Sequence, residues 1–212
     1  MGPFPDGVYR AQFPYYYRNP EGMPQEAALD YYLNSIKDVF EQCGPADSIA
    51  AIVVEPLQGE GGFIPAPIEW VKAVRKICDE NGILLVADEV QTGFCRTGRM
   101  FATQYWEEAG VQPDILATAK FIAAALKTIE IMERDDLAGC SCEIGEKVSK
   151  RFNEWKEKYP VIGDVRGLGG MIGLEFVKDQ KSKEPYPEFS AAVISGCAKK
   201  GLMIEGAGTY GN

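Results

Sequence analysis

The stretch "ILLVADEVQTGF", residues 83–94, joins a run of apolar residues to two acidic ones. Five consecutive apolar residues, 83–87, are typical of a buried strand in a parallel sheet. Asp88 and Glu89 follow with no turn residue between them. Because a carboxylate is costly to bury without a partner, we expect each of them to be hydrogen-bonded, ion-paired or in contact with a ligand.

Strands and helices alternate around this stretch. "SIAAIVVE" (48–55) reads as a second buried strand, and "LQGEGGFIPAP" (57–67) as a glycine-rich loop. "IEWVKAVRKICDENG" (68–82) has the apolar spacing of an amphipathic helix, and "PDILATAK" (113–120) reads as a third short strand. This order predicts an α/β fold in which a mostly parallel sheet is joined by crossover helices.

The predicted strands end in ionisable residues. Glu55, Asp88 and Lys120 stand at the carboxyl ends of the three strands. In open α/β sheets ligands bind outside these ends. We therefore expect the three side chains to approach one another at one edge of the sheet.

The rest of the chain predicts further helices and a smaller α+β region. Helices are expected at 24–44, in part of 97–110, at 126–137, at 142–158 and at 187–201, and strands at 161–177, as a hairpin, and at 202–208. We assign residues 1–137 to part of a large domain and residues 138–212 to part of a small C-terminal domain.

Composition excludes several classes of function. The net charge of −9 argues against nucleic acid or an anionic membrane as the main partner. The chain has no histidine, so it lacks the commonest metal ligand and any Ser–His or Cys–His pair, and no metal site is expected. Six scattered cysteines with no C-x-x-C spacing suggest free thiols in a cytoplasmic protein, and no apolar run is long enough to cross a membrane.

Asp88 and Lys120 together suggest one particular cofactor. Taken singly, Asp88 could be a helix cap or half of a structural ion pair, and Lys120 a solvated lysine. Together they match the needs of pyridoxal 5'-phosphate, whose ring nitrogen stays protonated beside an anion and whose aldehyde condenses with a lysine amine. Burial lowers the pKa of a lysine, so its free amine could also act as a base near neutral pH.

Three motifs carry a family resemblance. "AIVVEPLQGEGGFIPAP", "GILLVADEVQTGFCRTGRMF" and "PDILATAK" resemble the class III (omega) aminotransferases, which have the fold of type I pyridoxal-phosphate enzymes. "VRGLGGMIGLEF" and "AGTYGN" are most similar to bacterial 4-aminobutyrate aminotransferases. The resemblance implies a homodimer that transfers an amino group from an omega-amino acid or amine to a 2-oxo acid.

The resemblance also assigns roles to single residues. Asp88 matches the acid that binds the pyridine nitrogen, and Lys120 the lysine that bonds to the cofactor. Val90 matches the apolar residue on one face of the ring, and Gln91 the amide near the 3-hydroxyl group. Glu60 matches a glutamate near the substrate that pairs with an arginine in many members and governs dual substrate recognition.

Four further motif residues are assigned supporting roles. Glu55 and Glu89 are expected to be structural or to stand behind the residues that touch the cofactor. Arg96 and Arg166 are expected to be structural, with Arg166 ordering the small domain.

The sequence departs from the family pattern in length. Family members are roughly twice as long, and the upstream phosphate-binding turn and stacking aromatic residue are not present in this chain. A segment is missing near 122–124, and the chain stops before the arginine that grips the substrate carboxylate. The 212 residues alone are therefore not expected to form a complete active site.

Three other functions remain open from the sequence. Related enzymes with the same motifs are epimerases, racemases or aminomutases, and they keep Asp88, Gln91 and Lys120 alike. A fragment that folds and dimerises without binding cofactor is a second alternative. Nucleotide binding is weaker still, because the glycines of "LQGEGG" do not form G-x-G-x-x-G.

Overall fold

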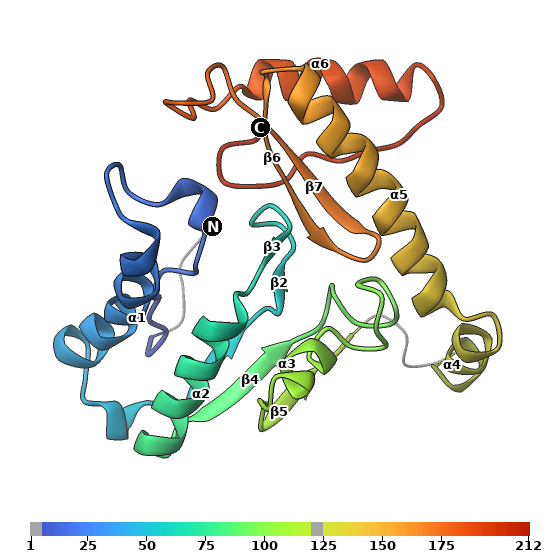
Figure 1. Ribbon diagram of the computed structural model, residues 1–212. Coiled ribbons are helices and arrows are strands. Elements are labelled where there is room, and N and C mark those ends of the chain that lie inside the picture. Colours follow the sequence, from blue (N-terminus) through green and yellow to red (C-terminus); the bar gives the residue numbers. More distant parts are fainter. Residues whose placement is uncertain (1–5, 120–124) are drawn as a thin grey trace. The chain divides into compact units, whose positions relative to one another are not determined.

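The computed structural model describes residues 6–119 and 125–212 (Figure 1). Contacts divide the chain into two compact units. The first comprises Met1–Val54, Ala66–Ala87 and Trp106–Leu116, and the second Glu55–Pro65, Asp88–Tyr105 and Ala117–Asn212. The predicted domain boundary at residues 137 and 138 remains a prediction.

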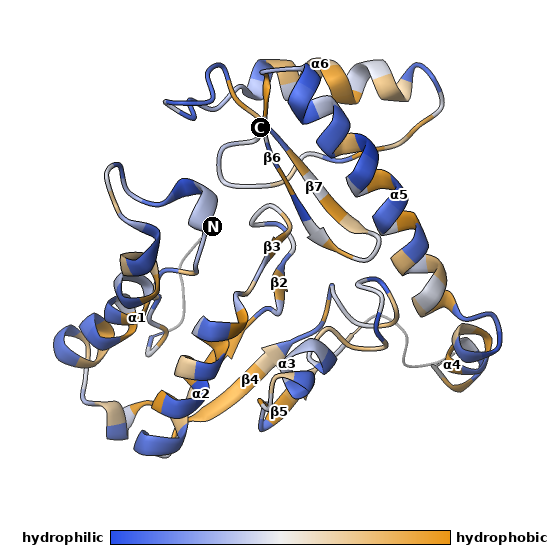
Figure 2. Cartoon of the chain, viewed as in Figure 1, coloured by the Kyte–Doolittle hydropathy of each residue, from blue (hydrophilic) through white to orange (hydrophobic). Residues whose placement is uncertain are grey.

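A three-stranded sheet organises the first unit. Its strands are β1 (Ala51–Val54), β4 (Leu84–Asp88) and β5 (Ile115–Ala117), in the order β1-β4-β5. β1 and β4 are parallel, in a register that runs from Ala51 opposite Leu84 to Val54 opposite Ala87. The α/β class with a parallel sheet is therefore confirmed, and β4 is apolar over most of its length, up to Asp88 at its end (Figure 2).

Helix α2 (Ile68–Asn81) connects β1 to β4 along the chain and buries one face in the core. Trp70, Val71, Val74 and Cys78 recur at helical spacing and are all buried. Gly82 ends the helix in the left-handed conformation, at φ 68°. The predicted helix and its glycine stop are thus both present.

Two more helices complete this core. α1 (Gln25–Gln42) contributes Ala28, Tyr32 and Ile36, and α3 (Gln104–Glu108) contributes Trp106. Two short 3-10 helices, Tyr16–Arg18 and Ala46–Ser48, flank α1. The residues from 6 to 24 are otherwise irregular.

The sheet buries only one of its faces against these helices. Leu85 and Ala87 point into the core, whereas Leu84 and Val53 are exposed. Ile115 of β5 is also exposed. In this unit the sheet therefore presents an apolar face to solvent.

The second unit contains two antiparallel pairs of strands. β2 (Leu57–Gln58) pairs with β3 (Ile64–Pro65), and β6 (Ile162–Leu168) pairs with β7 (Met171–Phe176). The β6–β7 hairpin was predicted, but the β2–β3 pair was read as a loop. Two-residue strands joined by a glycine-rich segment are too short to produce a periodic pattern.

Three helices accompany the hairpin in the second unit. They are α4 (Ala125–Arg134), α5 (Leu137–Lys158) and α6 (Pro187–Ala198). α5 packs along β6 and α6 contacts β7 (Figure 1). Asp136 caps α5 by accepting a hydrogen bond from the Gly139 amide at 3.1 Å.

One predicted strand is wrong. Residues 202–208 form no strand in the structure, and Leu202, Met203 and Ile204 are exposed. An apolar run becomes a strand only when a neighbouring edge offers hydrogen bonds, and no strand pairs with this segment in the described chain.

Two general features follow from the described residues. Within 6–119 and 125–212, no helix is long and apolar enough to cross a membrane, and no group of three acidic or cysteine side chains could hold a metal ion. All six cysteines are free thiols. Burial raises the pKa of the Cys78 thiol to about 11, so this thiol stays protonated at neutral pH.

Candidate active site

Asp88 ends β4 and begins the candidate site. Its Oδ1 accepts a hydrogen bond from the Val90 amide at 3.0 Å, and the side chain is half-buried. Among the residues that the structure describes, this is the one donor to the carboxylate. The second oxygen of Asp88 is therefore able to accept a hydrogen bond from a ligand.

Glu89, the next residue, serves a different purpose. Its side chain is completely buried and accepts three hydrogen bonds. The Thr103 amide donates to Oε1 at 2.7 Å, and the Ala102 amide and the Thr92 hydroxyl donate to Oε2. Glu89 thus ties together the two ends of the loop at 89–103, in agreement with the predicted structural role.

Gln91 lies directly against the glycine-rich segment at 59–63. A Cβ atom built on Gly59 would lie 1.3 Å from the Gln91 Oε1, so a larger residue at this position would displace the end of the Gln91 side chain. The Gly59 amide donates to Glu55 Oε2 at 3.0 Å. Two predicted site residues, Glu55 and Gln91, are thereby brought to the same short loop.

Glu60 follows Gly59 and has an exposed side chain. Its carbonyl oxygen accepts a hydrogen bond from the Gly208 amide at 2.8 Å. The position of the Glu60 backbone is therefore set by a segment almost 150 residues further along the chain. Asp88, Glu55, Glu60 and Gln91 all belong to the second unit.

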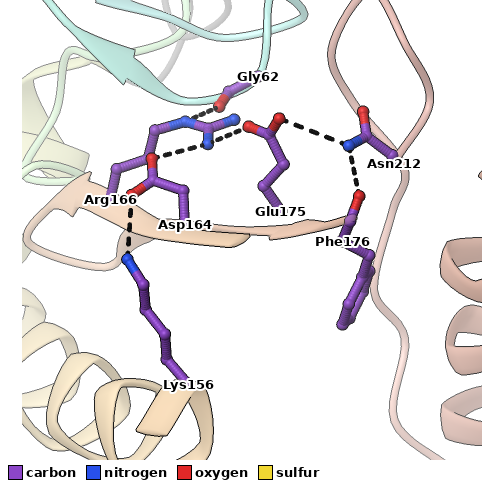
Figure 3. Close-up of polar contacts among 7 residues, drawn as sticks. All are labelled: Gly62, Lys156, Asp164, Arg166, Glu175, Phe176 and Asn212. Atoms are coloured by element: carbon purple, nitrogen blue, oxygen red, sulfur yellow. Dashed lines mark hydrogen bonds and ion pairs between the residues drawn. The ribbon is translucent and has the colours of Figure 1, made fainter. Parts of the chain in front are cut away.

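A cluster of charged residues lies on the neighbouring hairpin (Figure 3). Asp164 and Glu175 are cross-strand partners in β6 and β7, where two like charges would repel each other. Arg166 Nη1 donates to both, at 3.1 Å to Asp164 Oδ2 and at 2.6 Å to Glu175 Oε2. Arg166 Nε donates to the Gly62 carbonyl at 2.8 Å.

Glu175 is the most deeply buried member of this cluster, with 2% of its side chain exposed. Burial raises the pKa of its carboxyl, while the hydrogen bond from Asn212 and the charge of Lys183 lower it in part. Asn212 Nδ2 contacts Glu175 Oε1 at 3.4 Å and donates to the Phe176 carbonyl at 2.6 Å. The buried charge is therefore compensated from two sides.

This cluster is not predicted from the sequence. The family resemblance assigns a structural role to Arg166 but none to Glu175, Asp164 or Asn212. One signal was available: two acidic residues on adjacent strands of a predicted hairpin require a cation between them. The contact from Arg166 to Gly62 had no such signal, because the two residues are separated by 104 positions.

Of the remaining predicted residues, the structure describes Val90 and Arg96 but not Lys120. Lys120 lies outside the described residues, so its approach to Asp88 stays a prediction. Val90 is half-buried, and its contact with a ring also stays a prediction. The Arg96 carbonyl accepts hydrogen bonds from the Ser141 hydroxyl at 2.8 Å and the Gly170 amide at 3.0 Å, and the structural role of the arginine side chain stays a prediction.

The described residues fit one end of pyridoxal phosphate. A carboxylate with one oxygen left to accept a hydrogen bond suits a protonated ring nitrogen, and the Gln91 amide can donate to a ring hydroxyl. The turn from Asp88 to Gln91 carries both groups within four residues. The described residues therefore include side chains of the kinds that the cofactor ring needs.

Comparison with known proteins identifies the family. The model of the family "Aminotransferase class-III" matches residues 1–124 and 121–211. A probable 4-aminobutyrate aminotransferase of Bacillus subtilis strain 168 is 36% identical over 247 residues, which cover 100% of this chain and 56% of the relative. An isoleucine 2-epimerase of Lentilactobacillus buchneri is 32% identical over 239 residues, which cover 96% of this chain and 53% of the relative.

A solved structure agrees with this assignment. The crystal structure of an (S)-enantioselective omega-transaminase from Thermomicrobium roseum matches with a TM-score of 0.84 and 28% identity. The match covers 96% of this chain and 54% of that one. The match therefore includes residues of both units.

The chain spans about half the length of the curated relatives it matches. The two segments matched by the family model meet at residues 121–124, and the B. subtilis alignment runs over 247 residues against 212 in this chain. The break in the family match lies where the sequence predicts a missing segment, and the longer alignment agrees with residues missing from this chain. By sequence and by structure, the chain belongs to the class-III aminotransferase family.

Proposed function

We propose that the protein is a pyridoxal-phosphate-dependent aminotransferase. It would transfer an amino group from an omega-amino acid resembling 4-aminobutyrate, or from an amine, to a 2-oxo acid. The observation that carries the proposal is the contrast at the end of β4, where Glu89 accepts three hydrogen bonds and Asp88 only one from the described residues. Family membership and the names of the relatives support the same activity.

When bound, the cofactor supplies an electron-withdrawing ring that stabilises negative charge on the substrate Cα. Asp88 would hold a proton on the ring nitrogen by accepting its hydrogen bond. Gln91 would orient the ring through the 3-hydroxyl group, and Val90 would pack on one face. Lys120 would bind the cofactor covalently at rest and, once released, carry a proton to or from Cα with its Nζ atom.

The proposal extends to the assembly. We expect a homodimer in the cytoplasm, with residues 1–137 in a large domain and 138–212 in a small one. Family resemblance supports the dimer, and the six free thiols suit a reducing compartment. The substrates would be small molecules, and the net charge of −9 disfavours nucleic acid as a partner.

The proposal is tested by cofactor binding to the whole protein. Purified protein with added pyridoxal phosphate should show the visible absorbance of the lysine-bound cofactor, and borohydride should abolish it. Lys120→Ala should remove the absorbance, whereas Lys127→Ala, which changes an exposed lysine of α4, should keep it. A wild-type protein that binds no cofactor would leave only the inactive-fragment reading.

Asp88→Asn tests the role of the carboxylate directly. Breaking a buried charge pair costs roughly 3–5 kcal/mol, and half of that in the transition state slows the reaction at least about tenfold. We expect the variant to lose most of its transamination while still binding cofactor. Near-normal turnover would show that Asp88 does not contact the ring nitrogen.

A second function has support among the relatives, since one of them is an isoleucine 2-epimerase. An epimerase, a racemase or an aminomutase would use Asp88, Gln91 and Lys120 in the same way. Dependence on a 2-oxo acid acceptor separates them from an aminotransferase. Product formed from a single amino acid, with no acceptor present, would replace the proposed function by one of these.

A further inference from the structure

Arg166 joins three segments of the second unit through one guanidinium group. Its Nη1 atom contacts Asp164 and Glu175 on the hairpin, and its Nε atom donates to the Gly62 carbonyl (Figure 3). The arginine side chain is 14% exposed. These bonds are directional, because the guanidinium is a rigid planar fork.

The orientation of the fork is fixed from the hairpin side. Glu175 and Asp164 hold Nη1 from adjacent strands, and Asn212 holds the far oxygen of Glu175. With Nη1 anchored, the planar group directs Nε at a single point, the Gly62 carbonyl. The two acidic residues therefore determine where the arginine meets the loop.

The loop at 59–63 fits closely against this arginine. Gly62 has φ +118°, and a Cβ atom built on it would lie 3.1 Å from Arg166 Nη2 and 3.3 Å from the Gly208 Cα. The Gly208 amide donates a hydrogen bond to the Glu60 carbonyl at 2.8 Å. The loop is thus held at two successive points by distant parts of the chain.

The other end of the loop reaches the candidate site. Gly59 lies against the Gln91 side chain and donates to Glu55. Gly62 and Phe63 donate back to the Gly59 carbonyl at 3.0 and 3.3 Å, which closes the loop into one hydrogen-bonded turn. A shift at Gly62 would therefore be transmitted to Glu60 and to the Gln91 contact.

We propose that Arg166, oriented by Glu175, is a positioning residue that holds the loop at 59–63 and thereby places Glu60 and Gln91 for the reaction. Arg166 touches neither cofactor nor substrate in this role. The proposal goes beyond a general ordering of the small domain, because it names the Gly62 carbonyl as the contact that matters. It rests on the proposed function for its kinetic consequence but not for its structural one.

Hydrogen exchange of the whole protein without cofactor tests the structural part. In Arg166→Ala, the amides of Gly62, Phe63 and Gly208 should exchange about tenfold faster, while those of α5 stay unchanged. Arg166→Lys keeps the charge near Glu175 but loses the rigid fork, so we expect the same three amides to lose protection. Arg151→Ala, which removes an exposed arginine of α5, is the matched control.

Steady-state kinetics of the protein with bound cofactor test the functional part of the proposal. Because Glu60 is expected near the substrate, Arg166→Lys should raise KM for one substrate about tenfold while kcat changes less. A purely structural role would instead lower the amount of active enzyme and leave KM unchanged. The Arg151→Ala control should leave both constants unchanged.

Specific results overturn the proposal. Unchanged exchange at Gly62 and Phe63 in a folded Arg166 variant would do so, as would an equal rise over the whole hairpin and α5. If Arg166→Ala does not fold, Arg166→Lys decides by the same criteria. If the wild-type protein has no aminotransferase activity, the proposed function is wrong, but the hydrogen-exchange test of the structural part remains valid.

Discussion

The loop at 89–103 and the β6–β7 hairpin each bury one carboxylate, Glu89 in the first and Glu175 in the second. Glu89 is held by neutral donors, two amides and a hydroxyl, all from its own loop. Glu175 is held by a cation, Arg166, which also contacts the separate loop at 59–63. The first arrangement closes a single loop, whereas the second couples two segments.

The two arrangements are also expected to contribute differently to the free energy of unfolding. Neutral donors that lose their acceptor are left buried without a hydrogen bond, which costs about 1–3 kcal/mol each. A buried ion pair, in contrast, contributes little net stability because desolvation offsets much of the attraction, although removing one partner entirely costs roughly 3–5 kcal/mol. We therefore expect the hairpin pair to matter more for position than for stability.

The largest predicted effect is on Glu89. A glutamine side chain has one acceptor oxygen, and its NH₂ group is a donor. In Glu89→Gln, the backbone amide of Ala102 or of Thr103 therefore faces the NH₂ group and loses its acceptor. We expect a loss of at least about 3 kcal/mol in the free energy of unfolding, measured with urea. The exposed Glu146→Gln should change stability by less than about 0.5 kcal/mol.

Glu175→Gln should have a smaller effect. Glutamine can still accept from Arg166, and Asp164 keeps its bond to the same guanidinium. We expect a loss of about 1–2 kcal/mol by the same urea measurement. A loss equal to that of Glu89→Gln would break the contrast between the two regions.

Asp114 sharpens the comparison because it also pairs with an arginine, but at the surface. The hydrogen bonds from Arg75 and the Leu85 amide lower the pKa of Asp114 below its usual value. Its contribution to stability is therefore present above the unfolded pKa of about 3.9 and is lost as the pH falls through the folded-state value. Asp114→Asn should cost less than about 1 kcal/mol at pH 7.

The pH series supplies the check on that prediction. The stability difference between wild type and Asp114→Asn should shrink as the pH is lowered below 4, in urea titrations at successive pH values. Asp79→Asn, a change in the more exposed partner of Arg75, is the control and should show a weaker trend. A difference that grows toward acid would contradict the sign of the shift.

Much of the fold was predictable because it depends on local patterns. The apolar run before Asp88 and the helical spacing of Trp70, Val71 and Val74 specify strand and helix without distant information. The strand expected at 202–208 failed, since strand formation depends on a partner edge that no local pattern reveals. The β2–β3 pair was missed for the converse reason, because its partners are too short to be periodic.

The residues of the candidate site were predictable from the sequence, but the contacts that hold them in place were not. Asp88 and Gln91 follow from the end of an apolar strand and from the family motif. The bond to Asp88 is local, from the Val90 amide, but the saturation of Glu89 depends on where residues 102 and 103 return in space. The bond from Arg166 to Gly62 depends on a contact across 104 positions, which a single sequence cannot indicate.

The uncovered face of the β1-β4-β5 sheet has a practical consequence. Val53, Leu84 and Ile115 are exposed apolar residues of this sheet, and exposed apolar surface promotes self-association. We expect a preparation of the 212 residues to self-associate through these residues. Light scattering or gel filtration on such a preparation would then report this non-specific association rather than a specific oligomeric state.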